Sequence, residues 1–249
     1  MSSSIDPVVQ RLNSIIEDAT VEQSPAGYFP TLYCRVTQNV QQAILKGEFS
    51  NNERMEALVV VFASRYLDAY QAFQTGGKLT HSWKLAFKQH SNSSLIVLQH
   101  LLLGMNAHIN LDLGMAAAQV SSKEDILSLK DDFIMINDIL GGLINHTQRH
   151  LTRIFGPLGF VDNLLGSVDE RLSLFSISYA RDKAWSQTLE LTLANENDQK
   201  ALINERDDKV AAFAETLIQP PKFSLRLLLW MIRKLERGDT ATRIRMLGQ

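Results

Sequence analysis

The sequence predicts an all-α protein that folds as a single globular bundle of eight or nine helices over residues 1–249. Apolar residues recur at helical rather than alternating spacing along almost the whole chain. Glycine and proline fall mostly where a helix should begin or end. The chain contains no sequence repeat and no long linker. We therefore expect one domain with one large core.

The predicted helices follow in order along the chain. The first begins at Asp6-Pro7, because proline fits the first turn of a helix, and the third ends at Gly76-Gly77. The expected ranges are 6–19, 31–45, 52–74, a short helix after residue 80, 95–119, 122–155, 167–194, 198–218 and 223–237. The last is a basic amphipathic helix from about Lys222. We expect it to dock on the core, with contact to an anionic membrane surface as the alternative.

Composition excludes several classes of protein. The net charge is -2, which argues against nucleic-acid binding, since that normally needs an excess of Lys and Arg. Cys34 is the only cysteine, so an intrachain disulfide and a multi-cysteine zinc site are both impossible; we expect a buried side chain there. The N-terminus lacks the pattern of a signal peptide, and no run of apolar residues is long enough to span a membrane. We expect a cytoplasmic protein.

The stretch GMNAHINLDLGMAAA, residues 104–118, places polar side chains in the most apolar part of the chain. Residues four apart share one face of a helix, so His108 and Asp112 should project together, with Asn106 and Asn110 as a neighbouring polar pair. A buried ionised aspartate needs a partner. For Asp112 that partner is His108 in a structural pair, a bound metal, or other groups of a functional polar pocket.

A second polar motif, NHTQRH, places His146 and His150 four residues apart, and Asp132 lies on roughly the same stripe. If this helix packs antiparallel to the central one, these residues could join His108 and Asp112 around one divalent ion, zinc or iron. The alternative is that both histidines lie on a solvated face.

Two arginines lie in otherwise apolar helices. The guanidinium group keeps its charge, so Arg65 and Arg181 should each have a carboxylate or an anionic ligand nearby. The structural interpretation pairs Arg65 with Asp68 or Asp112, and Arg181 with Glu170 or an aspartate across the core. The functional interpretation makes one of them a clamp for an anionic substrate.

The segments FASRYLDAY, HSWKLAF, LLLGMNAHINLDLG, DDFIMINDIL and ARDKAW together resemble an uncharacterised bacterial family, a domain of unknown function of about this length. The resemblance covers most of the chain, and NAHINLDL is its most specific part. It implies an all-helical fold and no assigned activity. It also favours Asp132 and Asn137, rather than His146 and His150, as the site residues that the predicted helix over 122–155 contributes.

The leading hypothesis is an enzyme that acts on a small-molecule substrate at His108 and Asp112, in one form a metal-dependent hydrolase. With a metal, both residues would be ligands, completed by Asp132 or by the histidine pair, and Arg65 or Arg181 would orient an anionic group. Without a metal, His108 would be the general acid or base and Asp112 would fix its tautomer. The rival hypothesis is a non-catalytic helical binding or scaffold protein with a structural His-Asp network.

Overall fold

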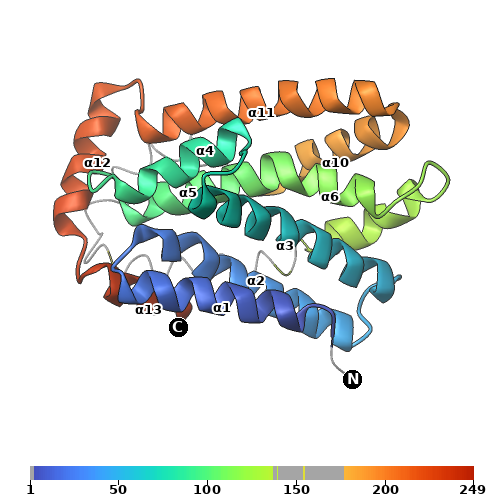
Figure 1. The fold of residues 1–249 in the computed structure, drawn as a ribbon, viewed down its shortest axis with the longest axis horizontal. Coiled ribbons are helices and arrows are strands. Elements are labelled where there is room, and N and C mark those ends of the chain that lie inside the picture. The colour runs from blue at the N-terminus through green and yellow to red at the C-terminus, as the bar shows by residue number, and fades with distance from the viewer. Residues whose placement is uncertain (1–2, 137–138, 140–153, 155–176) are drawn as a thin grey trace.

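The computed structural model describes residues 3–136, 139, 154 and 177–249 (Figure 1), and all regular structure within these ranges is helical. Ten α-helices have their bounds within this part: α1 (Asp6–Val21), α2 (Tyr28–Leu45), α3 (Asn52–Thr75), α4 (His81–Lys88), α5 (Val97–Ala107), α6 (Leu113–Gln119), α10 (Ile177–Leu193), α11 (Glu196–Ile218), α12 (Phe223–Leu235) and α13 (Thr240–Gly248). The start of a further helix is also described. The all-α class is confirmed. The number exceeds eight or nine because a π-helical turn divides the central helix and α13 follows α12.

The ends of α3 and α4 have the local causes that the sequence indicates. The side chain of Asn51 accepts a hydrogen bond from the backbone N–H of Arg54 at 3.0 Å, which caps the start of α3. Gly76, with φ 71°, ends that helix in the left-handed conformation that favours glycine. Thr80 caps α4 through the backbone N–H of Trp83. These ends fix the positions of α3 and α4, whose side chains build the site described below.

The predicted helix over 122–155 is described only near its start. A 3-10 turn, η4 (Ile126–Leu129), comes first, and residues 130–136 are α-helical. The carboxylate of Asp125 accepts the backbone N–H of Ser122 at 2.7 Å, as in a capping box.

The long helices run roughly along the longest axis of the molecule (Figure 1). Helices α1 and α2 lie at one side and α11 at the other, with α3, α4, α5 and α6 between them, while α12 stands across one end. Helix α6 packs on α10, and α5 packs on α4, α11 and α2. The α5–α6 segment is therefore buried on most sides, as its apolar sequence predicts.

Two glycines let neighbouring helices approach this central segment closely. A Cβ atom on Gly104 would lie 2.5 Å from Cγ of Phe29 on α2, and one on Gly114 would lie 2.5 Å from Oε1 of Gln187 on α10. Such distances are far shorter than van der Waals contact, so both positions require glycine unless the neighbour moves. Among the described helices, none is long and apolar enough to cross a membrane.

Candidate functional site

The NAHINLDL motif contains a change of helix type. Residues His108–Asp112 form a π-helical turn, η3, between α5 and α6. Such turns are uncommon and are frequent at functional sites, because the extra residue leaves part of the regular backbone pairing unmade. One carbonyl of this turn, that of Asn110, accepts a hydrogen bond at 2.7 Å from Nε of Arg206 on α11. The turn is thus held in place by a side chain from another helix.

His108 and Asp112 are paired at the centre of the bundle. Nδ1 of His108 lies 3.1 Å from Oδ2 of Asp112, and the two side chains are only 2% and 4% exposed. Nε1 of Trp83, on α4, donates to the same oxygen at 2.9 Å. The expected contact between the two residues is confirmed. No local pattern in the sequence links Trp83 on α4 to this turn.

Aromatic rings enclose the imidazole of His108. The ring of Phe62 stacks on it with centroids 3.6 Å apart, and Tyr33 meets it edge-on at 4.5 Å. Burial lowers the pKa of His108, the carboxylate of Asp112 opposes that shift, and the positive charge of Arg65 adds to it. A neutral imidazole then donates its Nδ1–H to the carboxylate. Its other nitrogen, Nε2, is buried and has no hydrogen-bond partner within the described ranges.

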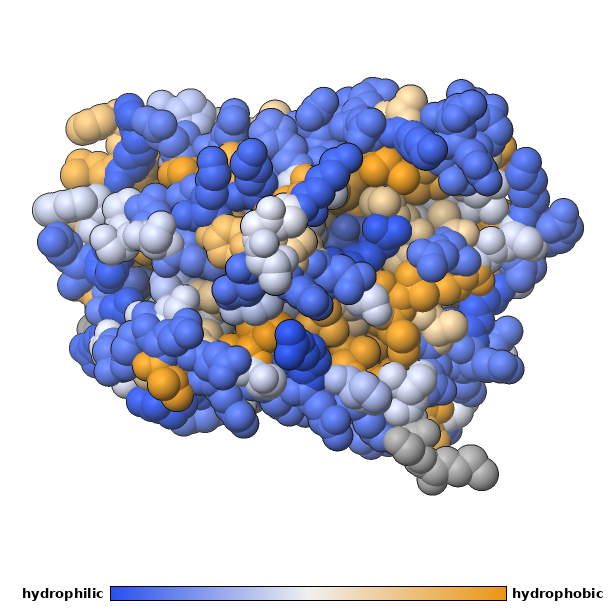
Figure 2. Space-filling model, viewed as in Figure 1, coloured by the Kyte–Doolittle hydropathy of each residue, from blue (hydrophilic) through white to orange (hydrophobic). Residues whose placement is uncertain are grey.

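Asp112, and not His108, is among the residues that line a groove of about 560 Å³. Helix α3 forms one wall, and the segment before α4, Trp83 of α4, Asp112 of η3 and Gln119 of α6 form the rest. The charged and polar side chains of the lining are Ser64, Arg65, Asp68, Lys78, Thr80, Asp112 and Gln119. Figure 2 shows the molecule hollowed between α3 and α6, with hydrophilic atoms at the bottom of the hollow. The groove contains carboxylates and cations close together, so it suits a ligand with both charges or with an anion and a hydroxyl.

Arg65 lines the same groove from α3. Its Nε atom is buried and has no hydrogen-bond partner in the part of the chain that the structure describes. The expected ion pair with Asp68 or Asp112 is not formed among these residues, where no carboxylate lies within salt-bridge distance of its guanidinium. A guanidinium cannot relieve its burial by losing a proton. The structure therefore leaves the half-buried Arg65 lining a groove, with no carboxylate of the described residues paired to its guanidinium.

The two asparagines of the motif point toward the opposite side of the central helix. Nδ2 of Asn110 donates to Oδ1 of Asn106 at 2.9 Å, and Nδ2 of Asn106 donates to the carbonyl of Val210 on α11 at 2.9 Å. The expected polar pair is confirmed. Both line a smaller pocket of about 370 Å³, together with Lys183 and Arg206. Their amide groups are occupied in holding α5 to α11, which is a structural role.

Arg181, on α10, lines neither cavity. Its guanidinium donates to the carbonyl oxygen of Phe133 and lies 4.5 Å from the centroid of the Phe133 ring. Burial lowers its pKa to about 9, and the charge of Asp182 opposes that shift. Arg181 is therefore not brought together with His108 and Asp112 as the catalytic hypothesis requires, and the partner expected at Glu170 lies outside the described residues. We assign Arg181 to packing between α10 and the helix that contains Phe133.

The structure describes only some of the candidate metal ligands. The carboxylate of Asp132, 2% exposed, accepts the backbone N–H groups of Ser50 at 2.7 Å and Asn51 at 3.0 Å, at the start of α3. His146 and His150 lie outside the described residues. Over the ranges that are described, no three His, Cys, Asp or Glu side chains form a group that could hold a metal ion. Asn137 also falls outside these ranges.

Cys34 is buried in α2, as the sequence predicts, and it is free. Burial raises the pKa of its thiol to about 11. A thiol with a raised pKa is a poor nucleophile at neutral pH. Cys34 therefore fills space beside the site and takes no part in its chemistry.

Comparison with models of protein families gives a match over most of the chain. The model of a family of unknown function, DUF5995, matches residues 5–220, which include all of the groove and the His108–Asp112 pair. No curated protein and no solved structure matched the chain. The resemblance of the sequence to a domain of unknown function is thereby confirmed, and the chain belongs to the DUF5995 family.

Proposed function

We propose that the groove between α3, α4 and α6 binds a small molecule with an anionic group, and that Arg65 holds that group. The observation that carries the proposal is the buried Nε of Arg65, which has no acceptor among the described residues although it lines a groove. Nε–H is a donor without an acceptor on a half-buried guanidinium side chain, so a ligand anion is the partner that this position favours. Lys78 lines the same groove and adds a second cation. A volume of about 560 Å³ is in the range of small-molecule sites.

We further propose that Asp112 accepts a proton or hydrogen bond from the same ligand. Trp83 and His108 both bond Oδ2, which fixes the orientation of the carboxylate while it lines the groove. This assigns Asp112 the part of general base and makes His108 a positioning residue behind it, the reverse of the roles that the sequence suggests. The expected substrate carries an anion a few ångströms from an ammonium or hydroxyl group. Proton transfer to a fixed carboxylate is then the reaction class.

The proposal is tested by thermal unfolding with two probes. Inorganic phosphate offers only the anion, whereas phosphoethanolamine adds an ammonium group for Asp112. A ligand at about ten times its Kd adds about 1.4 kcal/mol to the free energy of unfolding, which raises the Tm by about 3–6 °C for a chain of this size. We expect both probes to raise the Tm of the wild type, phosphoethanolamine more strongly.

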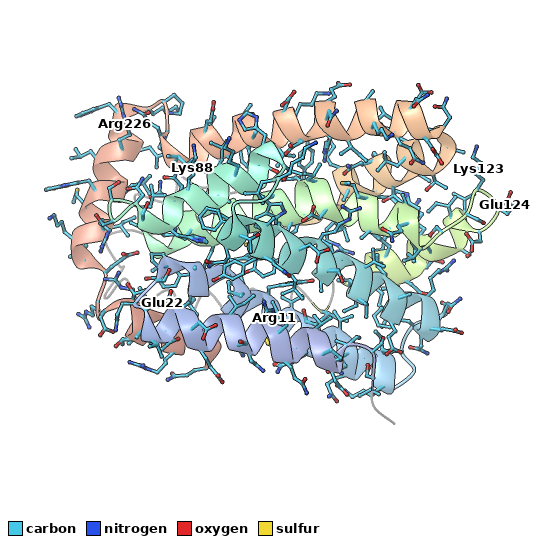
Figure 3. All side chains as sticks on the ribbon, in the orientation of Figure 1. Arg11, Glu22, Lys88, Lys123, Glu124 and Arg226 are labelled. Atoms are coloured by element: carbon cyan, nitrogen blue, oxygen red, sulfur yellow. The ribbon has the colours of Figure 1, made fainter. Side chains whose placement is uncertain are left out.

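Three variants assign the effect. Arg65→Gln should lose the response to both probes, and Asp112→Asn should lose only the advantage of phosphoethanolamine. Arg11→Gln is the matched control, because Arg11 is an exposed arginine on α1 (Figure 3). An equal rise in Tm for Arg65→Gln and the wild type would contradict the proposal. Repeating the series with a chelator and with zinc or iron added tests the divalent metal that the sequence hypothesis includes.

A structural role for the same residues is the rival, because His108, Asp112 and Trp83 form a buried network. If the network only holds the core together, neither probe changes the Tm of any variant. In that case, Asp112→Asn lowers the Tm of the protein without changing its response to either probe.

A further inference from the structure

Helix α12 carries apolar side chains on two opposite faces. Leu228 and Ile232 pack inward and are 5% and 6% exposed. Phe223, Leu227 and Trp230 are 71%, 47% and 59% exposed, and their spacing of four and three residues places them on one outer face. Docking on the core therefore accounts for only one of the two apolar stripes. The outer stripe has no packing partner in the described structure.

The charges of α12 accompany the outer stripe. From Lys222 to Leu235 the sequence holds four Lys or Arg residues and no Asp or Glu: Lys222, Arg226, Arg233 and Lys234. The guanidinium of Arg226 lies 5.9 Å from the ring centroid of Phe223, and Nζ of Lys234 lies 5.9 Å from that of Trp230. Cations and aromatic rings thus alternate on one surface.

The nearest carboxylate does not reach that surface. Glu236, directly after α12, is buried and accepts the backbone N–H of Val97 at 2.6 Å. Its other oxygen lies 3.3 Å from the guanidinium of Arg233 and 3.4 Å from that of Arg243. Glu236 therefore anchors the end of α12 to the start of α5, and the outer face keeps its positive charge.

The place of α12 in the fold leaves this face accessible. The helix stands across one end of the molecule, beyond the ends of the long helices (Figure 1), and hydrophobic atoms are visible over its upper part (Figure 2). Arg226 is labelled at this outer end in Figure 3. The family match ends at residue 220, just before α12 begins at Phe223. The face is thus separate both from the groove and from the matched region.

We propose that the outer face of α12 binds the surface of an anionic lipid bilayer. Phe223, Leu227 and Trp230 enter the boundary between headgroups and acyl chains, while Arg226 and Lys234 meet the phosphates. The anionic bilayer is a plane of negative charge, and it fits the outer face of α12 because cations lie along the whole length of that face. One short helix gives reversible attachment that weakens as salt screens the charges.

The test is co-sedimentation of the whole chain with vesicles. One set is phosphatidylcholine alone, and the other contains about one third phosphatidylglycerol. We expect the bound fraction to be at least about tenfold higher on the anionic vesicles and to fall sharply between about 50 mM and about 500 mM NaCl. Fluorescence of Trp230 should shift to the blue on binding.

Paired variants separate the outer face from general surface effects. Phe223→Ser combined with Trp230→Ser should abolish binding, whereas Leu45→Ser combined with Leu193→Ser should not, because both of these leucines are 63% exposed on other helices. All four positions are exposed, so circular dichroism should show both double variants folded.

The charges are tested in the same way. Arg226→Gln combined with Lys234→Gln should weaken binding about tenfold. Arg11→Gln combined with Lys88→Gln, which removes two exposed cations from α1 and α4, should not weaken it.

Three results would overturn the proposal. The first is the absence of binding to anionic vesicles, and the second is equal binding by the Phe223→Ser/Trp230→Ser variant. The third is a dimer in light scattering that this variant abolishes while vesicle binding is absent, which would assign the face to a second copy of the chain.

Discussion

Nδ1 of His108 lies 3.1 Å from Oδ2 of Asp112, inside a single π-helical turn, and only the aspartate lines the groove. The imidazole is enclosed by aromatic rings, so it acts on the groove through the carboxylate that it holds. Trp83 reinforces this arrangement from α4. The pair is therefore one unit with an inner member and an outer member that lines the groove, and our proposed function gives the outer member the contact with the ligand.

Removing the carboxylate should destabilise the fold. Asp112→Ala leaves Nε1–H of Trp83 and Nδ1–H of His108 buried without an acceptor, which costs about 2–4 kcal/mol of the free energy of unfolding. Urea unfolding followed by circular dichroism measures this loss. Asp68→Ala, an exposed carboxylate in the same groove, should change the value by less than about 0.5 kcal/mol. Equal effects of the two changes would refute the network.

Asp132 should act as a cap for the backbone. Asp132→Ala leaves the N–H groups of Ser50 and Asn51 without their acceptor, and we expect a loss of about 2–3 kcal/mol. Asp131→Ala is the matched control, because Asp131 is the exposed neighbour. The comparison uses chemical denaturation in a chelating buffer. If the loss appears only when metal is present, Asp132 is a metal ligand instead.

Buried histidines should make stability depend on pH. Burial lowers the pKa of His100 to about 3, from an ordinary value near 6.5. Because the folded-state pKa is the lower one, protonation favours the unfolded chain. The contribution of His100 is complete above about pH 6.5 and is lost as the pH falls from there toward 3. The slope is at most about 1.4 kcal/mol per pH unit.

His100→Gln provides the measurement for this pH dependence. Glutamine does not titrate, so the difference in free energy of unfolding between wild type and variant should shrink or reverse between about pH 7 and about pH 4.5. Titration of all other groups cancels in the difference. Parallel curves for the two proteins would show that His100 is not buried as described.

Close helix packing gives a fourth prediction. In an exposed helix, Gly→Ala stabilises by about 1 kcal/mol, but a Cβ on Gly104 would overlap the ring of Phe29. Overpacking costs about 1–3 kcal/mol, so Gly104→Ala should be destabilising on balance. Thermal unfolding gives the sign. A rise in Tm would mean that α5 and α2 are farther apart than the structure has them.

The sequence predicts the helices and the His108–Asp112 contact because both follow from local spacing. Hydrophobic periodicity fixes a helix face, and a separation of four residues brings two side chains together on it. The π-helical turn is not visible in that pattern, since a single inserted residue leaves the apolar spacing nearly unchanged. Helix α13 is absent from the sequence prediction because it has only nine residues, which are too few for a helical repeat to stand out.

The rest of the site depends on tertiary contacts. Trp83 reaches Asp112 only because α4 packs on α5. The sequence predicts Asp132 beside the other ligands because spacing on a helix shows which side chains share a face. Spacing cannot show that the backbone N–H groups of Ser50 and Asn51 pack against that face. The expected pairing of Arg65 failed for a similar reason, as a nearby carboxylate in sequence does not guarantee contact in space.

The most direct measurement is the Nε–Hε signal of Arg65 in a ¹H–¹⁵N NMR spectrum. Its loss in Arg65→Gln assigns it, and titration with phosphoethanolamine tests whether an anion reaches the buried nitrogen. We predict a progressive, saturable shift of the Arg65 signal with no matching shift of the Arg11 signal. If the Arg65 signal moves no more than that of Arg11 at saturating probe, the groove does not hold an anion at Arg65 and the central proposal is wrong.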